Sequence, residues 1–428
     1  MQRVVITGMG CVTPFGFGVN TFWNALLKSE NGIKKVDHLK LTGEIVNIAG
    51  TMPHIDSSCL PESLSILKNH LPEDDSILSF FMAVDEAVND SGIDFEKYTS
   101  TDKVGAFIAD RRMGEITYVE QYGSVIAQCR KEDGSIDISR FYELSKNVGK
   151  RSLFDDYDSL NHFVSRIYNI TGPQLSLSTA CASSNSSIGE AFIKIQSGEI
   201  DTAICGGAYN YDLNAMLGFS RLGALSKNPD PDEACKPFDA RRDGFIMGSG
   251  CGILILESFE KAKRRDAKIY GEVKGYGYFS DAFRSTDPDP ESKGITRTIQ
   301  AALDMAGLDK NQISYINAHG TSTKMNDYSE TTGIKNVFGE QAYHIPVSST
   351  KSMIGHSIMA SGALEGIVSL MSINNNIIHG THNWKERDSK LDLDYVGDVP
   401  FREMEVTNVL SNSFGFGGQN ACIVYSKF

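Results

Sequence analysis

The sequence lacks the features that mark several common protein classes. No uninterrupted apolar run is long enough to span a bilayer, so no membrane association is predicted. The eight cysteines are scattered and form no Cys-x-x-Cys pair, which gives no sign of a zinc site or a disulfide framework. Positive charge is scarce as well, with 41 Lys and Arg against 54 Asp and Glu. The net charge of −13 argues against nucleic acid as a partner.

The bulk composition is that of an ordinary folded protein, with 41% apolar and 22% charged residues. A chain of 428 residues is too long for one ordinary core, so we expect two domains or one duplicated α/β unit. The opening residues carry no apolar signal-peptide core and are typical of a first strand, which favours a cytoplasmic protein. We place the boundary in the charged run 261–268, which gives halves 1–265 and 266–428. A polar segment at about 110–165 is predicted to form a cap of loops and short helices.

One short segment combines a strand, a cysteine and a helix. Residues 174–179 alternate in polarity as a strand does, whereas apolar residues after Cys181 recur at helical spacing until Gly198. Cys181 therefore lies where a strand passes into the N-terminus of a helix. Unpaired backbone N–H groups and the positive end of the helix dipole favour a thiolate and an oxyanion there. Since most free cysteines are inert core residues, this pattern alone leaves both readings open.

Three further segments place polar residues at the predicted ends of strands. His319 follows one strand, Lys351 and His356 follow another, and a glycine-rich turn at 415–418 precedes the last. In open α/β sheets, ligands gather at the C-terminal ends of strands. Each residue alone could be a core histidine, a surface lysine or part of a tight turn, but their joint position predicts a site. The early Gly8-Met-Gly10 lacks the third glycine of a dinucleotide fingerprint, so we do not predict such a site.

Four motifs resemble the signatures of the elongating β-ketoacyl-ACP synthases. They are Ser178-Thr-Ala-Cys-Ala-Ser-Ser, Asn317-Ala-His-Gly-Thr-Ser-Thr, Ser349-Thr-Lys-Ser-Met-Ile-Gly-His and Asn412-Ser-Phe-Gly-Phe-Gly-Gly-Gln-Asn. The resemblance runs from end to end, and it implies the α/β thiolase fold, with two similar αβαβα halves in five layers. The nearest groups it indicates are the KAS II enzymes and the ketosynthase-alpha subunits of type II polyketide synthases.

The resemblance implies a decarboxylative Claisen condensation. Cys181 would carry the acyl chain, with its own N–H and that of Phe416 as the oxyanion hole. His319 and His356 would donate hydrogen bonds to the malonyl thioester carbonyl. No metal and no permanently bound cofactor are implied, because the phosphopantetheine arm arrives on an acyl carrier protein. Lys351 would order the site, with Glu330 as its expected partner.

Other positions match supporting roles in the family. Thr321 and Thr323 match residues that hydrogen-bond the phosphopantetheine arm. Phe416, between Gly415 and Gly417, matches a gating phenylalanine that shields the acyl-enzyme. Phe245 matches a residue near the departing CO2, although plain core packing explains it equally well.

The chain departs from the family pattern in three places. Asp110-Arg-Arg stands where a glycine-rich turn is usual, and aspartates 155, 156 and 158 precede the nucleophile strand beside the expected acyl pocket. The segment before residue 77 is acidic where carrier-protein docking would need cations. The remaining docking candidates are Lys68, Arg111, Arg112, Lys150, Arg151 and Lys227.

These departures favour a ketosynthase of a polyketide or other specialised pathway, as a homodimer or paired with a chain-length-factor-like subunit. A KAS II of fatty acid synthesis is the alternative. A non-catalytic partner subunit is the main alternative of another class, and Cys181 with both histidines opposes it. A thiolase or a chain-initiating enzyme would need a different set of residues around the cysteine.

Overall fold

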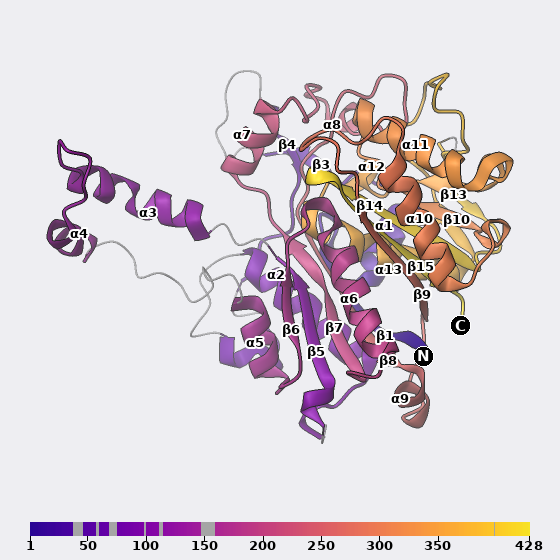
Figure 1. The fold of residues 1–428 in the computed structure, drawn as a ribbon, viewed down its shortest axis with the longest axis horizontal. Helices are drawn as coiled ribbons and strands as arrows, with labels where there is room; N and C mark the ends of the chain where they lie inside the picture. Colours follow the sequence, from indigo (N-terminus) through magenta and orange to yellow (C-terminus); the bar gives the residue numbers. More distant parts are fainter. Residues whose placement is uncertain are drawn as a thin grey trace.

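The computed structural model describes residues 1–36, 46–56, 60–67, 75–97, 100–110, 114–146, 159–397 and 399–428. Its main feature is an 11-stranded mixed sheet (Figure 1). Two small sheets of two strands each, β3–β4 (Ile33–Lys35, Ile48–Gly50) and β12–β13 (Ile377–His379, Phe401–Glu403), complete the strands of the described chain.

Five N-terminal strands form one half of the large sheet, in the order β1-β8-β7-β5-β6. Strand β5 is parallel to β6 and β7, whereas β8 is antiparallel to β7 and β1. The short β2 (Gly16–Phe17) pairs with the end of β1. The five strands are β1 (Val4–Thr13), β5 (Val104–Ala109), β6 (Gln174–Leu177), β7 (Thr202–Tyr209) and β8 (Gly250–Ser258).

The C-terminal strands repeat this arrangement, in the order β9-β15-β14-β10-β11. In both halves the first strand lies beside the fifth, followed by the fourth, second and third. An antiparallel pairing of β1 with β9 joins the halves into one sheet. The repeat confirms the duplicated α/β architecture expected from the sequence. The strands are β9 (Gly271–Ser280), β10 (Tyr315–Asn317), β11 (Val347–Ser348), β14 (Asn408–Gly415) and β15 (Gln419–Ser426).

Two helices occupy the interior between the halves. Helix α6 (Ser183–Gln196) and helix α13 (Ser361–Asn375) contact each other and strands of both halves. Helix α2 (Asp75–Ser91) covers β1 and β8 from outside, and α10 (Lys293–Ala306), backed by α11 (Lys324–Phe338), covers β9. The result is five layers, with the start of each central helix near the C-terminal ends of the parallel strands.

The glycines of the first strand serve this packing. A Cβ at Gly8 would lie 2.2 Å from the carbonyl oxygen of Ala87, and one at Gly10 would lie 2.1 Å from that of Ala83. Both contacts are too close for any side chain, so the two glycines let α2 lie directly on β1. The Gly-x-Gly pattern thus has a structural role.

The helices begin and end close to the positions that the periodicity predicts. Apolar periodicity in the sequence predicts helices at 22–27 and 77–88. The first begins earlier, as α1 (Val19–Leu27), and the second is longer, as α2. Segment 110–165 contains α3 (Gly114–Cys129), α4 (Ile138–Ser145) and the start of α5 (Ser159–Ile167). Figure 1 shows α3 and α4 extending away from the sheet, while α5 contacts β5. The remaining helices are α7 (Leu213–Arg221), α8 (Pro231–Ala234), α9 (Phe259–Arg264) and α12 (Lys351–Ile354).

Candidate active site

Cys181 lies in a tight turn between β6 and α6. Residues Ala180–Ala182 form one 3-10 turn, and Ala180 has a φ of 51°. Such a φ is uncommon for a residue with a Cβ, and strained backbone of this kind is often held at functional sites. The turn leaves the cysteine side chain 7% exposed. The thiol is therefore buried but not sealed from the cavity described below.

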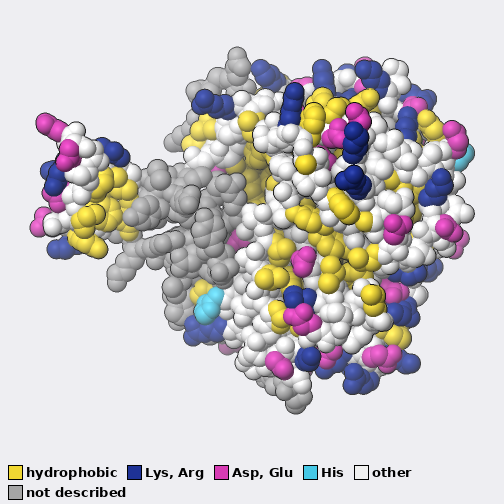
Figure 2. Space-filling view, viewed as in Figure 1, with side chains coloured by type: hydrophobic (Ala, Val, Ile, Leu, Met, Phe, Trp, Pro, Cys, Tyr) yellow, Lys and Arg dark blue, Asp and Glu magenta, His cyan; other side chains and the backbone are white. Residues whose placement is uncertain are grey.

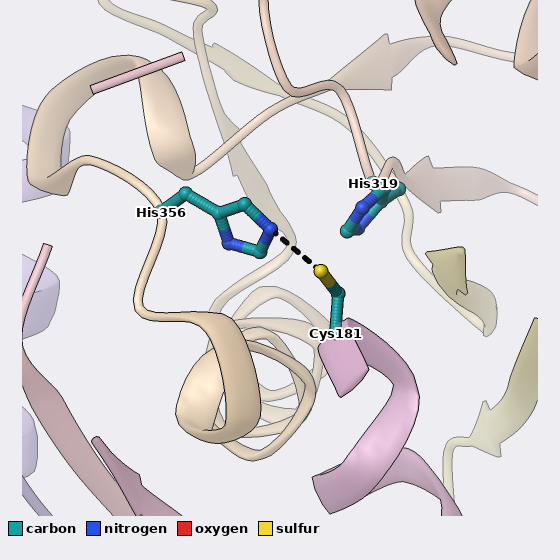
Figure 3. A group of neighbouring side chains, drawn as sticks. All are labelled: Cys181, His319 and His356. Carbon is teal, nitrogen blue, oxygen red and sulfur yellow. Dashed lines mark hydrogen bonds between the residues drawn. The ribbon is translucent and has the colours of Figure 1, made fainter. Parts of the chain in front are cut away.

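Two histidines from the C-terminal half lie beside the sulfur (Figure 3). Nε2 of His356 is 3.1 Å from Sγ of Cys181, and its Nδ1 is 3.0 Å from Oγ of Ser361. The ring of His319 is nearly perpendicular to that of His356, at 82°, with centroids 5.2 Å apart. His319 follows β10, and His356 follows α12. Residues that lie at predicted strand ends in the sequence thus meet in one site.

Burial controls the protonation of this site. It lowers the pKa of both His319 and His356 well below the ordinary value, with Lys351 nearby adding to the effect, so both rings are neutral at pH 7. Burial also raises the pKa of the Cys181 thiol to about 11, although Lys351 and two backbone N–H groups oppose it. Desolvation therefore outweighs the effect of the helix terminus, which alone would favour the thiolate.

The glycine-rich turn brings backbone N–H groups to the sulfur. Hydrogen bonding by the N–H groups of Phe416 and Cys181 lowers the pKa of the Cys181 thiol. A Cβ at Gly415 would lie only 3.0 Å from the backbone nitrogen of Cys181, so this close approach requires glycine. Gly417 has a φ of 79°, in the left-handed region that also favours glycine. Two N–H donors thus converge where an oxyanion would form.

Lys351 pairs with a different acid from the one expected. Its ammonium bonds to Glu365 on α13, and both side chains are almost fully buried. Glu330 instead accepts hydrogen bonds from the N–H groups of His319 and Gly320, each at 2.8 Å, and from Asn412 at 3.1 Å. The prediction of a Lys351–Glu330 pair is therefore wrong. Glu330 fixes the turn that carries His319, and Glu365 neutralises the buried lysine.

Aromatic rings surround the histidines and the glycine-rich turn. The ring of Phe245 meets that of His356 edge-on at 5.2 Å. Phe219 on α7 packs against Phe245 at 5.2 Å and against Phe416 at 5.8 Å. Phe219 therefore links the two phenylalanines that the sequence singles out.

One cavity of about 280 Å³ opens onto these groups. Cys181, His319 and His356 lie at its inner end together with the aromatic residues above. Thr321 and Thr323 also line it, with their hydroxyl oxygens 3.0 Å apart. Thr323 in addition caps α11 by accepting the N–H of Asn326. The cavity is a passage from the protein surface to the thiol.

The sulfur and one nitrogen of each histidine ring lie within 4.8 Å of one another. A single metal ion could bridge three groups at this spacing, so the expectation that the site needs no metal stays a prediction. No helix in the described part of the chain is long and apolar enough to cross a membrane.

Three residues of the site escaped sequence reasoning. Glu365 had a visible signal, because it is the one charged residue in segment 361–375. Ser361 and Phe219 had none, because a serine at a helix start and a phenylalanine among apolar residues are common. Of the docking candidates, Lys227 lies among the described residues and is exposed, and the other five lie outside them, as do aspartates 155, 156 and 158.

Comparisons with known proteins identify the family of the chain. Residues 1–262 match the family described as β-ketoacyl synthase, N-terminal domain, and residues 270–385 match its C-terminal domain. The chain is 38% identical over 429 residues to 3-oxoacyl-[acyl-carrier-protein] synthase 2 of Staphylococcus aureus strain COL, covering all of this chain and 99% of that protein. The chain therefore belongs to the β-ketoacyl synthase family, and it is a ketosynthase, an acyltransferase of the β-ketoacyl-ACP synthase type.

Solved structures extend the likeness. A type II polyketide ketosynthase, solved in complex with its acyl carrier protein (AntDE:AntF), matches with a TM-score of 0.84 and 29% identity over the whole of both chains. The ishigamide ketosynthase/chain length factor matches with a TM-score of 0.84 and 30% identity, covering all of this chain and 99% of that one. The fold is accordingly the thiolase fold of the ketosynthases.

Proposed function

We propose that this ketosynthase condenses a malonyl thioester with an acyl chain held on Cys181. The observation that carries the proposal is the 3.1 Å contact between His356 Nε2 and Cys181 Sγ, with His319 beside it at the inner end of a cavity. Such an arrangement provides a nucleophile, a base and two hydrogen-bond donors in one buried place.

Acyl loading begins with a neutral thiol and a neutral imidazole. His356 Nε2 takes the thiol proton as Sγ attacks the incoming thioester carbonyl. The N–H groups of Cys181 and Phe416 stabilise the resulting oxyanion. The proton then passes to the leaving phosphopantetheine sulfur, which restores neutral His356. The Ser361 hydroxyl supports this cycle, since it can accept from Nδ1 or donate to it as the ring changes tautomer.

Condensation uses the same two rings as donors. The malonyl thioester binds with its carbonyl oxygen between His319 and His356. Loss of CO2 leaves the C–C electron pair as an enolate, whose oxygen accepts both N–H hydrogen bonds. The enolate carbon attacks the carbonyl of the Cys181 thioester, and the sulfur leaves as a thiolate while the β-ketoacyl product forms. The thiolate then takes up one proton from solvent, which restores the thiol. Neutral rings suffice for this role, which agrees with their lowered pKa values.

Intact-protein mass spectrometry tests the proposal directly. Incubation with an acyl-loaded carrier protein should add one acyl mass, located on the peptide that contains Cys181. Cys181→Ala should abolish the addition, whereas Cys235→Ala, at another buried cysteine, should retain it. An adduct absent under conditions that label a known synthase, or present in Cys181→Ala, would refute the assignment.

The pathway has two candidates. A polyketide or other specialised pathway is supported by the polyketide ketosynthases among the structural neighbours and by Asp110 where a glycine-rich turn is usual. A role in fatty acid synthesis is supported by the 38% identity to the Staphylococcus aureus synthase over its whole length. The products that form after malonyl carrier protein is added to the acyl-enzyme distinguish the two pathways. Repeated condensation without ketone reduction indicates a polyketide pathway. Efficient use of long saturated acyl chains indicates KAS II.

A second subunit of the same fold is part of the proposal. Strand β6 lies at one edge of the large sheet and pairs only with β5 among the described strands. Its side chains are largely exposed, including Leu175 at 39%. An exposed edge strand can pair with another chain, and one of the structural neighbours is a ketosynthase/chain length factor. Native mass spectrometry separates a homodimer from a heterodimer, and a monomer that retains full activity would contradict this part.

A further inference from the structure

We infer that Arg284 and Lys324 bind the phosphate of the phosphopantetheine arm at the mouth of the active-site cavity. The inference rests on the proposed function, since it concerns how that site receives its substrate. Both residues line the same cavity as Cys181, and both are exposed. Apart from the two catalytic histidines, they are the basic side chains of that lining among the described residues.

The two cations come from separate segments of the C-terminal half. Arg284 lies in the loop after β9, and Lys324 is the first residue of α11, directly after Thr323. In the sequence, Thr321 and Thr323 lie between the catalytic His319 and Lys324. Both threonines line the cavity. An arm that reaches Cys181 along these threonines carries its anionic end outward, because the phosphate joins the arm to the carrier protein.

Neither cation is strongly engaged within the chain. Lys324 forms no ion pair with any residue that the structure describes. Arg284 forms an ion pair, at 3.3 Å, with Asp287 three residues away, and the two side chains are 67% and 41% exposed. Its guanidinium also lies 5.4 Å from the ring centroid of the neighbouring Phe283. An exposed ion pair of this kind is weak, so the anionic phosphate of the arm can displace Asp287.

Two of the acidic side chains that line the same cavity have partners other than Arg284 and Lys324. Asp243 is paired with Lys236 at 3.2 Å, and Asp281 accepts from Asn420 at 2.7 Å. Asp287 faces Arg284. The cations therefore stand out locally on a chain whose net charge is −13. On the face drawn in Figure 2, Lys and Arg are scattered among acidic side chains.

Two small substrates isolate the phosphate from the carrier protein: an acyl-pantetheine, and the same acyl-pantetheine bearing a 4′-phosphate. The apparent second-order rate constant of Cys181 acylation is measured for each substrate. We expect the natural protein to prefer the phosphorylated substrate by about tenfold, roughly threefold from each exposed cation. The preference should shrink as NaCl is raised from about 0.05 M to about 0.5 M.

Three sets of variants test the residues. Arg284→Met and Lys324→Met should each lower the preference about threefold, and the double variant should remove it. Asp287→Asn should raise it, because Arg284 then has no competing carboxylate. Lys310→Met, an exposed lysine outside the cavity lining, should leave it unchanged.

The outcomes separate this inference from the proposed function. If neither small substrate nor acyl carrier protein labels Cys181, the proposed function fails. If labelling proceeds but the natural protein shows no preference for the phosphate, the inference is wrong. If the double variant weakens labelling by acyl carrier protein yet keeps the phosphate preference, the inference is also wrong, and the two cations contact the carrier protein itself.

Discussion

Replacing Lys351 with methionine should extend the pH dependence of the protein's stability above pH 7. Lys351 and Glu365 are 1% and 2% exposed and bond to each other in the interior. Methionine fills a similar volume but leaves Glu365 without a counter-charge. Breaking a buried pair from one side typically costs about 3–5 kcal/mol, because an uncompensated charge stays behind.

The pKa of Glu365 determines how that cost varies with pH. Burial raises this pKa from 4.5 to about 7 even with Lys351 opposing the rise. Without Lys351 the folded pKa lies higher still, so the folded variant keeps Glu365 protonated where the unfolded chain releases the proton. Stability therefore falls as pH rises above 4.5 in both proteins, by about 1.4 kcal/mol per pH unit. In the natural protein the fall ends near pH 7, whereas in the variant it continues up to the higher folded pKa, so each pH unit above 7 adds a loss of roughly 1.4 kcal/mol.

Urea unfolding at pH 7, 8 and 9 measures this dependence, with tryptophan fluorescence as the probe and protein concentration held fixed. The pH slope that Lys351→Met adds should vanish in a Glu365→Gln background and persist in a Glu330→Gln background. The opposite pattern would restore Glu330 as the partner and refute the assignment. A loss of stability that is the same at all three pH values would refute the electrostatic reasoning.

Four further predictions concern the reaction. Alkylation of Cys181 by iodoacetamide should accelerate about tenfold per pH unit from pH 7 towards pH 10, because its pKa is about 11, and a plateau near pH 7 would contradict a resting thiol. His319→Ala should slow decarboxylation of malonyl carrier protein by about 10²–10³ while sparing acyl loading. His356→Ala should impair both decarboxylation and acyl loading. Normal decarboxylation by either variant would contradict the role proposed for that histidine. Phe219→Ala removes the ring that packs on Phe416, so the acyl-enzyme should hydrolyse several-fold faster, and an unchanged lifetime in a mass-spectrometric time course would argue against shielding. Turnover should survive exhaustive dialysis against EDTA, since neutral imidazole N–H groups suffice, and a loss that zinc restores would show that the Cys-His-His group holds a metal.

The position of the nucleophile and both histidines could be predicted because each follows a strand with clear polarity. Parallel strands share one C-terminal edge, which groups His319 with His356 in the C-terminal half. The meeting of these histidines with Cys181 of the other half depends on how the two halves pack together. The resemblance to the family motifs then indicated which role each of these residues has in the reaction. The alternation of strands with helices predicted an α/β architecture, and the resemblance to the family implied the thiolase fold.

Interactions set by depth of burial could not be predicted. The distance from Lys351 to Glu365 or Glu330 depends on how α13 enters the interior, which no local pattern encodes. Desolvation of Cys181 likewise depends on packing from the C-terminal half, and it reverses the pKa shift that the helix start alone would produce. The sequence periodicity of α3 and α4 indicates only that each is a helix. It does not determine the direction in which these helices extend from the sheet.

The most direct test of the account is a single-turnover condensation followed at Cys181. The enzyme is first acylated by an acyl carrier protein and then mixed with malonyl carrier protein, and both proteins are weighed by mass spectrometry over time. The account predicts that the acyl mass leaves Cys181 as a β-ketoacyl group two carbons longer appears on the second carrier protein, with release of one CO2. Loss of the acyl mass without that product, or the product from Cys181→Ala, would contradict it.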